Sequence, residues 1–279
     1  MKNTYIKSPL NYVGGKYKLL PQIIPLFPSG IDTFIDLFGG GGNVCANVEA
    51  NHIVYNDINP KIVELLSYFA SNNVPTLLAE IDAIIQKYEL SKTNSEGFMK
   101  LRSDYNSSQE RSCMQLYMLI CHAFNYQIRF NSKGEYNMPF GKDRSCFNDT
   151  LRKNFIHFVV QLNTSDIKFV SKSFTDLKLN NLKPNDFVYC DPPYYNSVAA
   201  YNENGGWTGA DEKTLLEMLD QLTVLNIRWA LSNNLKYDNP LLEEWRQKYN
   251  THYLNCDYSN CNYQKLDRSK DVEVLITNY

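Results

Sequence analysis

The chain has 279 residues, of which 43% are hydrophobic and 21% charged, and its formal net charge is −2 at pH 7. This composition is that of an ordinary globular protein and excludes disordered and fibrous classes. A chain of this length can bury the core of one large domain or of a main domain with a smaller insertion. The small negative net charge excludes a general polyanion-binding surface, so nucleic-acid binding would need a local basic face.

The N-terminal sequence and the cysteines bear on compartment and metals. The chain opens without an apolar segment of signal-peptide length, and no stretch reaches the roughly 18 apolar residues of a membrane span. We therefore expect a cytoplasmic protein without membrane contact. The cysteines are odd in number and scattered, and the histidines show no metal or triad spacing, so we expect neither disulfides nor a metal site.

The first half of the chain begins with a strand and a glycine-rich turn. The apolar patterning predicts a strand at 31–36, a turn at 39–42, a helix at 43–50 and a strand at 53–55. A second helix is predicted from Pro60, whose ring suits the first helical turn, to Phe69. From about residue 74 to residue 124 apolar residues recur at helical spacing, so this segment is expected to be mainly helical.

The second half returns to alternating strands and helices. Turn formers between two short extended arms predict a β-hairpin at 129–138. After it we expect a helix at 149–163, strands at 167–170 and 187–190, a helix at 211–225, and strands at 228–232 and 272–276. This order predicts an α/β fold with a doubly wound, mostly parallel sheet, interrupted by an insert at 61–160.

A run of four glycines, Gly39 to Gly42, lies between the first predicted strand and the next helix. Missing side chains let backbone N–H groups approach a ligand closely, which favours a small-molecule pocket. The run lacks the Gly-Lys-Ser/Thr ending of a phosphate-binding loop and the regular dinucleotide spacing. Asp57 follows about 20 residues after the turn begins, where an acidic side chain can accept from both hydroxyls of a ribose. The turn therefore predicts a nucleoside cofactor; the alternative is a tight turn with a solvated acid.

The segment Asp191-Pro192-Pro193-Tyr194 directly follows a predicted buried strand, so its groups emerge at the carboxyl end of a parallel sheet. Prolines donate no N–H group and stiffen the chain, which leaves carbonyl acceptors. An aromatic amine is a poor nucleophile because its lone pair is delocalised, and acceptors for both N–H groups would localise that pair. Asp191 and the Pro192 carbonyl can accept, while Tyr194 offers a face for an extruded base. The alternative is a rigid turn without a catalytic role.

These motifs, in this order, resemble the Dam family of DNA adenine methyltransferases, the D12 class of group alpha. There a glycine-rich motif precedes a target-recognition insert, and an Asp-Pro-Pro-Tyr motif follows it. The resemblance runs from about Pro9 to the last residue. It is strongest at Tyr12 to Lys16, Asp36 to Asn43, Asn56 to Asn59, Asn137 to Gly141, Ser173-Phe174 and Asp191 to Tyr194. It implies the S-adenosylmethionine-dependent methyltransferase fold, with residues 1–60 and 161–279 as the catalytic domain and residues 61–160 as the DNA-binding insert.

The resemblance also implies a site for S-adenosylmethionine. It places Tyr12 and Lys16 near the methionine end of the cofactor and Asp57 near the ribose. The further cofactor-binding residues that it implies are Phe38, Gly40, Gly42, Ile58, Ser173, Phe174 and Asp191. The chain departs from the closest family members at Tyr12, where Trp is common, and at Cys45, where a larger aromatic residue is usual.

In the family the hairpin contacts bases. The resemblance thereby assigns DNA binding to Asn125, Tyr126, Gln127, Arg129 and Lys142. Arg129 is the expected base reader, since arginine can meet O6 and N7 of guanine in the major groove. The alternative for Arg129 is contact with a phosphate or an internal carboxylate. The stretch from 129 to 153 is rich in Lys and Arg, which predicts a basic face or an ordinary solvated surface.

We therefore expect a site-specific enzyme that transfers a methyl group from S-adenosylmethionine to N6 of a flipped-out adenine in double-stranded DNA. The expected catalytic residues are Asp191, Pro192, Pro193 and Tyr194, with neither a metal nor a cysteine nucleophile. Residues 232–234 are expected in the target pocket, and residues 195–207 form either a loop that closes over the base or a plain surface loop.

Other aspects of function stay open at this point. Duplex DNA is the expected partner, and a restriction endonuclease of the same system is a candidate. The resemblance suggests GATC as the recognition site, which the hairpin residues do not establish. The alternatives to adenine methylation are N4 methylation of cytosine and a catalytically silent DNA-binding protein of the same fold; an RNA or small-molecule methyltransferase explains the hairpin less well.

Overall fold

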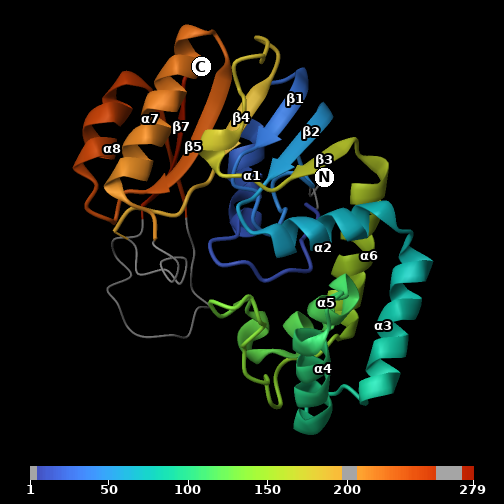
Figure 1. Ribbon diagram of the computed structural model, residues 1–279. Helices are drawn as coiled ribbons and strands as arrows, with labels where there is room; N and C mark the ends of the chain where they lie inside the picture. Colours follow the sequence, from blue (N-terminus) through green and yellow to red (C-terminus); the bar gives the residue numbers. More distant parts are fainter. Residues whose placement is uncertain (1–4, 197–205, 256–271) are drawn as a thin grey trace.

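The computed structural model describes residues 5–196, 206–255 and 272–279, and one seven-stranded sheet forms its centre (Figure 1). The strand order is β3-β2-β1-β4-β5-β7-β6. The strands are β1 (Ile31–Asp36), β2 (Ala50–Asn56), β3 (Ile167–Val170), β4 (Phe187–Cys190), β5 (Arg228–Asn234), β6 (Asn250–Leu254) and β7 (Glu273–Thr277). The first five pair in parallel, while β7 runs antiparallel between β5 and β6. The predicted α/β fold with a mostly parallel sheet is confirmed.

The strand order reverses at β1, because the strands that follow it in the sequence are added first on one side of it and then on the other. β1 pairs with β2 on one side and with β4 on the other. Such a reversal of strand order opens a crevice at the carboxyl ends of the parallel strands, where ligands of open α/β sheets bind. The sheet thus determines where a functional site is expected, before any side chain is considered.

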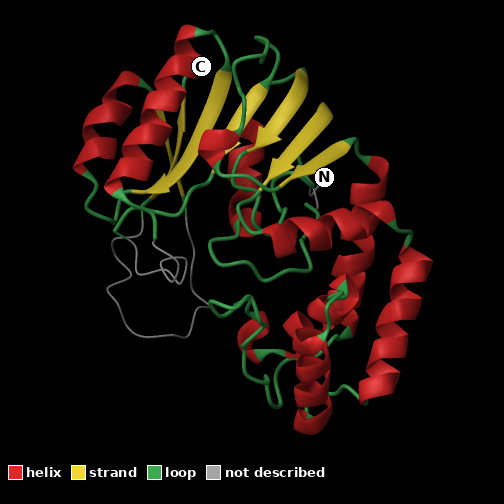
Figure 2. Cartoon of the chain, viewed as in Figure 1, coloured by secondary structure: helices red, strands yellow, loops and turns green. Residues whose placement is uncertain are grey.

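Helices cover both faces of the sheet (Figure 2). The α-helices of the described residues are α1 (Leu20–Ile23), α2 (Pro60–Ser71), α3 (Val74–Tyr88), α4 (Ser95–Ser107), α5 (Cys113–His122), α6 (Asp149–Thr164), α7 (Gly209–Val224) and α8 (Pro240–Trp245). Successive strand residues alternate between the two faces. Phe34 and Tyr189 therefore join the core that contains α1, while Ile35 and Val188 join the core that contains α7.

Capping side chains explain where most of these helices begin. Seven of them follow a residue whose side-chain oxygen accepts a hydrogen bond from a backbone N–H group in the first turn, which stabilises a helix start. These residues are Asn59, Asn73, Asn94, Ser112, Asn148, Thr208 and Asn239.

The helices α3, α4 and α5 gather apart from the sheet, and α6 leads back to it (Figure 1). A short hairpin follows α5, with Phe130 paired to Tyr136 and Gly134 donating its N–H to the Asn131 carbonyl. The hairpin forms as predicted. α2 packs against β3, α5 and α6, so it contacts both the sheet and the helical region. The division of the chain at residues 61 and 160 stays a prediction.

One predicted helix is absent. Residues 43–50, expected as a helix, form turns up to Asn47, and β2 begins at Ala50. The side chain of Asn47 bonds the backbone of Ile6, and Asn43 accepts from the N–H of Ser8. These bonds to the N-terminal segment stabilise the turns, and residues 43–50 do not form a continuous helix. The sequence analysis also did not predict α1, α8 and β6.

The structure also bears on membranes and metals. Within the described ranges no helix combines the length and apolar character that a membrane crossing requires. Across those same residues, no three His, Cys, Asp or Glu side chains gather in a way that could hold a metal ion.

Candidate active site

The segments singled out in the sequence meet at the carboxyl edge of the sheet. The glycine turn follows β1, Asp57 follows β2, Ser173 lies just after β3, and Asp191 directly follows β4. These strands are neighbours in the sheet. Residues separated by more than a hundred positions are therefore brought to one crevice by strand pairing.

The glycine turn and Asp57 are joined by hydrogen bonds. Asp57 Oδ2 accepts from the N–H of Gly40 at 2.9 Å, and its Oδ1 accepts from the N–H of Asn59 at 2.8 Å. Burial raises the pKa of Asp57, while the two N–H groups oppose that shift. A carboxylate offers about four acceptor sites, so two bonds leave capacity for a ligand. The neighbouring Ile58 is 75% exposed and supplies an apolar surface beside this acid.

Gly40 and Gly42 have positive φ angles of 50° and 75°. A β-carbon on Gly40 would lie 3.1 Å from the ring of Tyr12, and one on Gly42 would lie 3.1 Å from Phe158. The positive φ angles favour glycine at both positions, and a side chain would also press on these rings. Tyr12, expected at the cofactor site, packs its ring over the turn.

Asp36, the last residue of β1, was not among the predicted ligands. It is 1% exposed, and its Oδ2 has no hydrogen-bond partner among the residues that the structure describes. Burial and the nearby Asp191 raise the pKa of Asp36 to about 8. A buried acceptor without a partner is costly, so it points to a donor supplied from outside the chain. Its position at a strand end before the glycine turn was the signal in the sequence.

Three aromatic rings gather beside this turn. Phe38 and Phe174 have ring centroids 5.5 Å apart, and Trp207 lies 5.7 Å from the first and 5.4 Å from the second. The indole N–H of Trp207 donates to Glu212, which is fully buried and also accepts from Asn239. Phe38 and Phe174 were expected at the cofactor, while Trp207 was placed only in a loop. Ser173 caps the turn of Phe174 by accepting from the N–H of Thr175.

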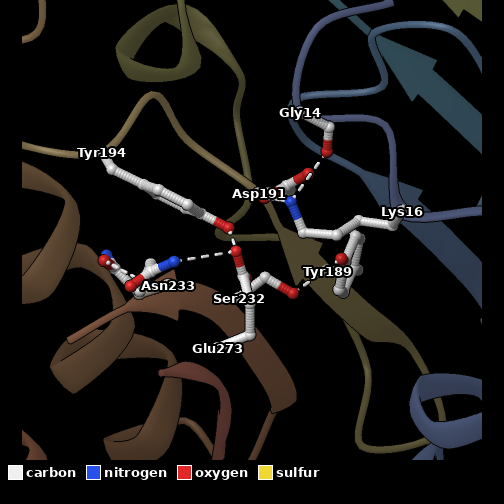
Figure 3. Close-up of polar contacts among 9 residues, drawn as sticks. Gly14, Lys16, Tyr189, Asp191, Tyr194, Ser232, Asn233 and Glu273 are labelled. Atoms are coloured by element: carbon white, nitrogen blue, oxygen red, sulfur yellow. Dashed lines mark hydrogen bonds and ion pairs between the residues drawn. The ribbon is translucent and has the colours of Figure 1, made fainter. Parts of the chain in front are cut away.

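Asp191 forms an ion pair with Lys16 (Figure 3). Lys16 Nζ lies 2.7 Å from Asp191 Oδ1, donates to the Gly14 carbonyl at 2.9 Å, and stands 5.2 Å from the centre of the Tyr194 ring. Burial raises the pKa of Asp191 to about 6, against the lowering effect of Lys16. A shielded carboxylate and an aromatic face of the Asp-Pro-Pro-Tyr segment therefore both lie next to the Lys16 cation.

The phenol of Tyr194 is bonded to a residue of β7. It donates to Glu273 Oε2 at 2.9 Å, and Asn234 donates to Glu273 Oε1 at 3.0 Å. Ser232, from the same strand as Asn234, bonds the hydroxyl of Tyr189 (Figure 3). Of the three residues expected in the target pocket, Asn234 is thereby linked to Tyr194. Glu273 was missed because its segment was read only as a strand.

The residues assigned to DNA lie on and around the hairpin. Asn125 and Tyr126 adopt left-handed φ angles of 53° and 56°, and the Gln127 carbonyl accepts from the hydroxyl of Tyr136. Arg129 is exposed and bonds the side chain and carbonyl of Asn137, and among the described residues it pairs with no carboxylate. Lys142 is exposed.

Two expectations fall partly or wholly outside the described residues. Of the loop expected at 195–207, the structure describes residues 195, 196, 206 and 207. The cysteines at 256 and 261 also lie outside. Cys190 is fully buried in β4, and burial raises the pKa of its thiol well above the usual value, so it is a core residue and not a thiolate nucleophile.

The strand order, with the glycine turn and the Asp-Pro-Pro-Tyr segment at the carboxyl edge of the sheet, is that of the α/β fold of methyltransferases. The model of the D12 class of N6 adenine-specific DNA methyltransferases matches residues 12–260. The chain therefore belongs to this family, and the family expected from the sequence is confirmed. A methyltransferase of this kind requires a methyl donor and a DNA substrate.

Curated relatives agree with the family. The chain is 47% identical over 284 residues to the type II methyltransferase M.FokI of Planomicrobium okeanokoites and 42% identical over 284 residues to the modification methylase StsI of Streptococcus sanguinis. Each match covers 99% of this chain but only 43% of the relative. The DNA adenine methylase of Escherichia coli K12 is 28% identical over 252 residues, which cover 87% of this chain and 85% of the methylase. The chain thus spans less than half the length of the first two relatives.

Proposed function

We propose that this chain transfers a methyl group from S-adenosylmethionine to N6 of an adenine in double-stranded DNA. The observation that carries the proposal is the contact of Asp191, Lys16 and Tyr194 at the end of β4, in a chain of the D12 family. Here an acceptor and a flat aromatic face stand together at the crevice where parallel sheets bind ligands.

Asp191 and the carbonyl of Pro192 are the proposed acceptors for the two N–H groups of the target amine. Accepting both bonds localises the lone pair of the amine and stabilises the positive charge that develops on nitrogen. Tyr194 stacks on the extruded base, and Pro193 stiffens the turn between them. Lys16 keeps Asp191 in its ionised, accepting form by lowering the pKa of that carboxyl. Catalysis in this proposal is positioning and electrostatic stabilisation without a covalent intermediate on the protein.

S-adenosylmethionine is the proposed methyl donor, and it supplies a methyl group on a positively charged sulfur that an amine can take up directly. The glycine turn fits a closely bound ligand, and the partnerless Oδ2 of Asp36 fits a positively charged or N–H-bearing one. To the predicted cofactor residues we add Asp36 as an acceptor and Trp207 as an apolar wall. The predicted residues are Tyr12, Lys16, Phe38, Gly40, Gly42, Asp57, Ile58, Ser173, Phe174 and Asp191.

The DNA is proposed to contact the insert at 61–160, through Asn125, Tyr126, Gln127, Arg129 and Lys142. The exposed guanidinium of Arg129 supports a role in base reading, because its bonds to Asn137 leave further donors. Modification methylases among the relatives support a restriction endonuclease of the same system as a partner. A DNA substrate supports the cytoplasm as the compartment of the reaction.

Incubation of the protein with labelled S-adenosylmethionine and unmethylated duplex DNA tests the function. The wild type should transfer label to DNA, and Asp191→Ala should abolish transfer. Binding of S-adenosylhomocysteine to Asp191→Ala, measured by calorimetry, should fall by a smaller factor than the rate of transfer does. Transfer by Asp191→Ala at the wild-type rate would contradict the role of this residue. Binding of the cofactor analogue without transfer by the wild type would favour a silent DNA-binding protein.

A further inference from the structure

The carboxylate of Glu273 is placed to control the Tyr194 ring. Glu273 is the first residue of the antiparallel strand β7 and is 4% exposed. Its two oxygens have different partners: Oε2 accepts from the Tyr194 hydroxyl at 2.9 Å (Figure 3), and Oε1 accepts from Asn234 Nδ2 at 3.0 Å. Removing water from a carboxylate is costly, so a buried one that binds two donors calls for a specific explanation.

Asn234 fixes the orientation of this carboxylate. Its Oδ1 accepts from the N–H groups of Lys236 at 3.0 Å and Val272 at 3.4 Å, so its Nδ2 must face Glu273. The pairing of β5 with β7 also sets Asn234 directly opposite Glu273. The pairing of the strands and the bond from Asn234 therefore fix the position of the Glu273 carboxylate, which is the acceptor for Tyr194.

Tyr194 is consequently held at both ends. Pro193 restricts the backbone on one side, and the bond to Glu273 anchors the phenol at the far end of the ring. Lys16 Nζ lies 5.2 Å from the ring centroid, and the ring of Tyr237 lies 6.2 Å away, tilted by 45°. Without the anchor, the ring could rotate about its side-chain bonds and its face would no longer point in one direction.

We propose that Glu273 is a positioning residue that, through the hydroxyl of Tyr194, fixes the aromatic face on which the target base stacks. This inference rests on the proposed function and deepens it, because it extends the base site from the Asp-Pro-Pro-Tyr segment to the far strand β7. Glu273 acts through Tyr194, and Asn234 holds the carboxylate of Glu273 in place.

The chemistry of the side chain explains why a carboxylate suits this position. A hydrogen bond to an ionised acceptor is about twice as strong as one between neutral groups. Glutamine has one acceptor oxygen and one donor NH₂ group, so it cannot present acceptors to both Tyr194 and Asn234. Glu273→Gln should therefore lose one of the two bonds while keeping the size of the side chain.

The charge of Glu273 supplies a second readout. The groups that act on Asp191 are Lys16, which lowers its pKa, and Glu273, which raises it; Asp36, Tyr189, Cys190 and Tyr194 stand close by. Removing the negative charge of Glu273 should let the pKa of Asp191 fall. The acid side of the pH–rate profile then moves to lower pH, which tests that Glu273 carries its charge beside Tyr194 and Asp191.

A double-mutant cycle tests the proposal on the full chain. Transfer of label to duplex DNA is measured for the wild type, Glu273→Gln, Tyr194→Phe and the double variant, with the exposed Glu217→Gln as matched control. We expect Glu273→Gln to lower kcat/KM for DNA about tenfold, the loss of one charge-assisted bond. S-adenosylhomocysteine binding should stay within about twofold. In the Tyr194→Phe background, Glu273→Gln should lower kcat/KM for DNA by at most about threefold.

Three outcomes would overturn the inference. These are wild-type kcat/KM in Glu273→Gln, a penalty of equal size in both backgrounds, or an acid limb that does not move. If Glu273→Gln fails to fold, Tyr194→Phe decides alone, because it removes only the anchoring oxygen, and wild-type rates would contradict the proposal. Lack of transfer by the wild type itself would instead contradict the proposed function.

Discussion

Lys16 Nζ lies 2.7 Å from Asp191 Oδ1 and 5.2 Å from the centre of the Tyr194 ring. One cation therefore contacts both groups that are proposed to receive the target base. Resemblance had assigned Lys16 to the methionine end of the cofactor, whereas the geometry connects it equally to the base site. This relationship makes the ionisation of Asp191 depend on Lys16.

The pH dependence of methyl transfer follows from that ion pair. Asp191 accepts hydrogen bonds most strongly when ionised, and its pKa is about 6, so activity should fall as the pH drops through about 6. Lys16→Met removes the effect that lowers this pKa, so the acid limb should move to higher pH. Profiles of kcat/KM for DNA check this, with the exposed Lys213→Met as control. An acid limb at the same pH in Lys16→Met would show that another group titrates.

Asp36→Asn should raise the stability of the protein at high pH and weaken cofactor binding. In the folded chain Asp36 keeps its proton up to about pH 8, whereas the unfolded chain loses it near 3.8. Stability should therefore decline as the pH rises between these values, and the asparagine variant should lack this decline. We expect it to be more stable at pH 8 by about 1 to 3 kcal/mol.

The same variant should bind S-adenosylhomocysteine at least about tenfold more weakly, because an ammonium or N–H donor of the ligand would draw Asp36 into its ionised, accepting form, which asparagine cannot adopt. Thermal melts at pH 5 and pH 8 and calorimetric titrations measure both effects. Undiminished affinity would contradict the assignment of Asp36 to the cofactor.

Trp207 offers a direct probe of the cofactor pocket. It packs on Phe38 and Phe174, while Trp229 and Trp245 are buried and stacked on one another at 5.4 Å in the core. Addition of S-adenosylhomocysteine should therefore change the fluorescence of Trp207 alone. The change should disappear in Trp207→Phe and persist in Trp245→Phe. A signal that survives in Trp207→Phe would place the ligand elsewhere.

Site choice should depend on Arg129. If its guanidinium meets a guanine bidentately, Arg129→Ala should reduce discrimination against substituted sites by about 1 to 3 kcal/mol, with little effect on S-adenosylhomocysteine binding. Sequencing of methylated sites, with Lys213→Ala as control, measures this. A uniform loss of affinity across all sequences would identify a phosphate contact instead.

The strands and the long helices could be predicted because their periodicity is local. Residues 167–170 and 187–190 form β3 and β4 with the predicted bounds, and the helix from Pro60 forms α2. The helix expected at 43–50 failed because Asn43 and Asn47 bond the N-terminal segment, a contact across about 40 positions that periodicity does not reveal.

The site was predicted where a motif was contiguous. Asp191 to Tyr194 lie together in the sequence, and strand order alone brings Asp57 and Phe174 to the same crevice. Glu273 and Trp207 escaped prediction because their roles depend on tertiary partners, Tyr194 for the first and Phe38 for the second. Asp36 stood in a motif, but its proposed role as an acceptor rests on a buried oxygen that has no hydrogen-bond partner among the described residues.

The most direct test of the account is the identity of the methylated base. Wild-type protein is incubated with unmethylated duplex DNA and labelled S-adenosylmethionine, the DNA is digested to nucleosides, and the labelled species is identified by mass spectrometry. The account predicts label on the N6-methylated adenine nucleoside. Label on N4 of cytosine, or no label in DNA while the cofactor is bound, would contradict it.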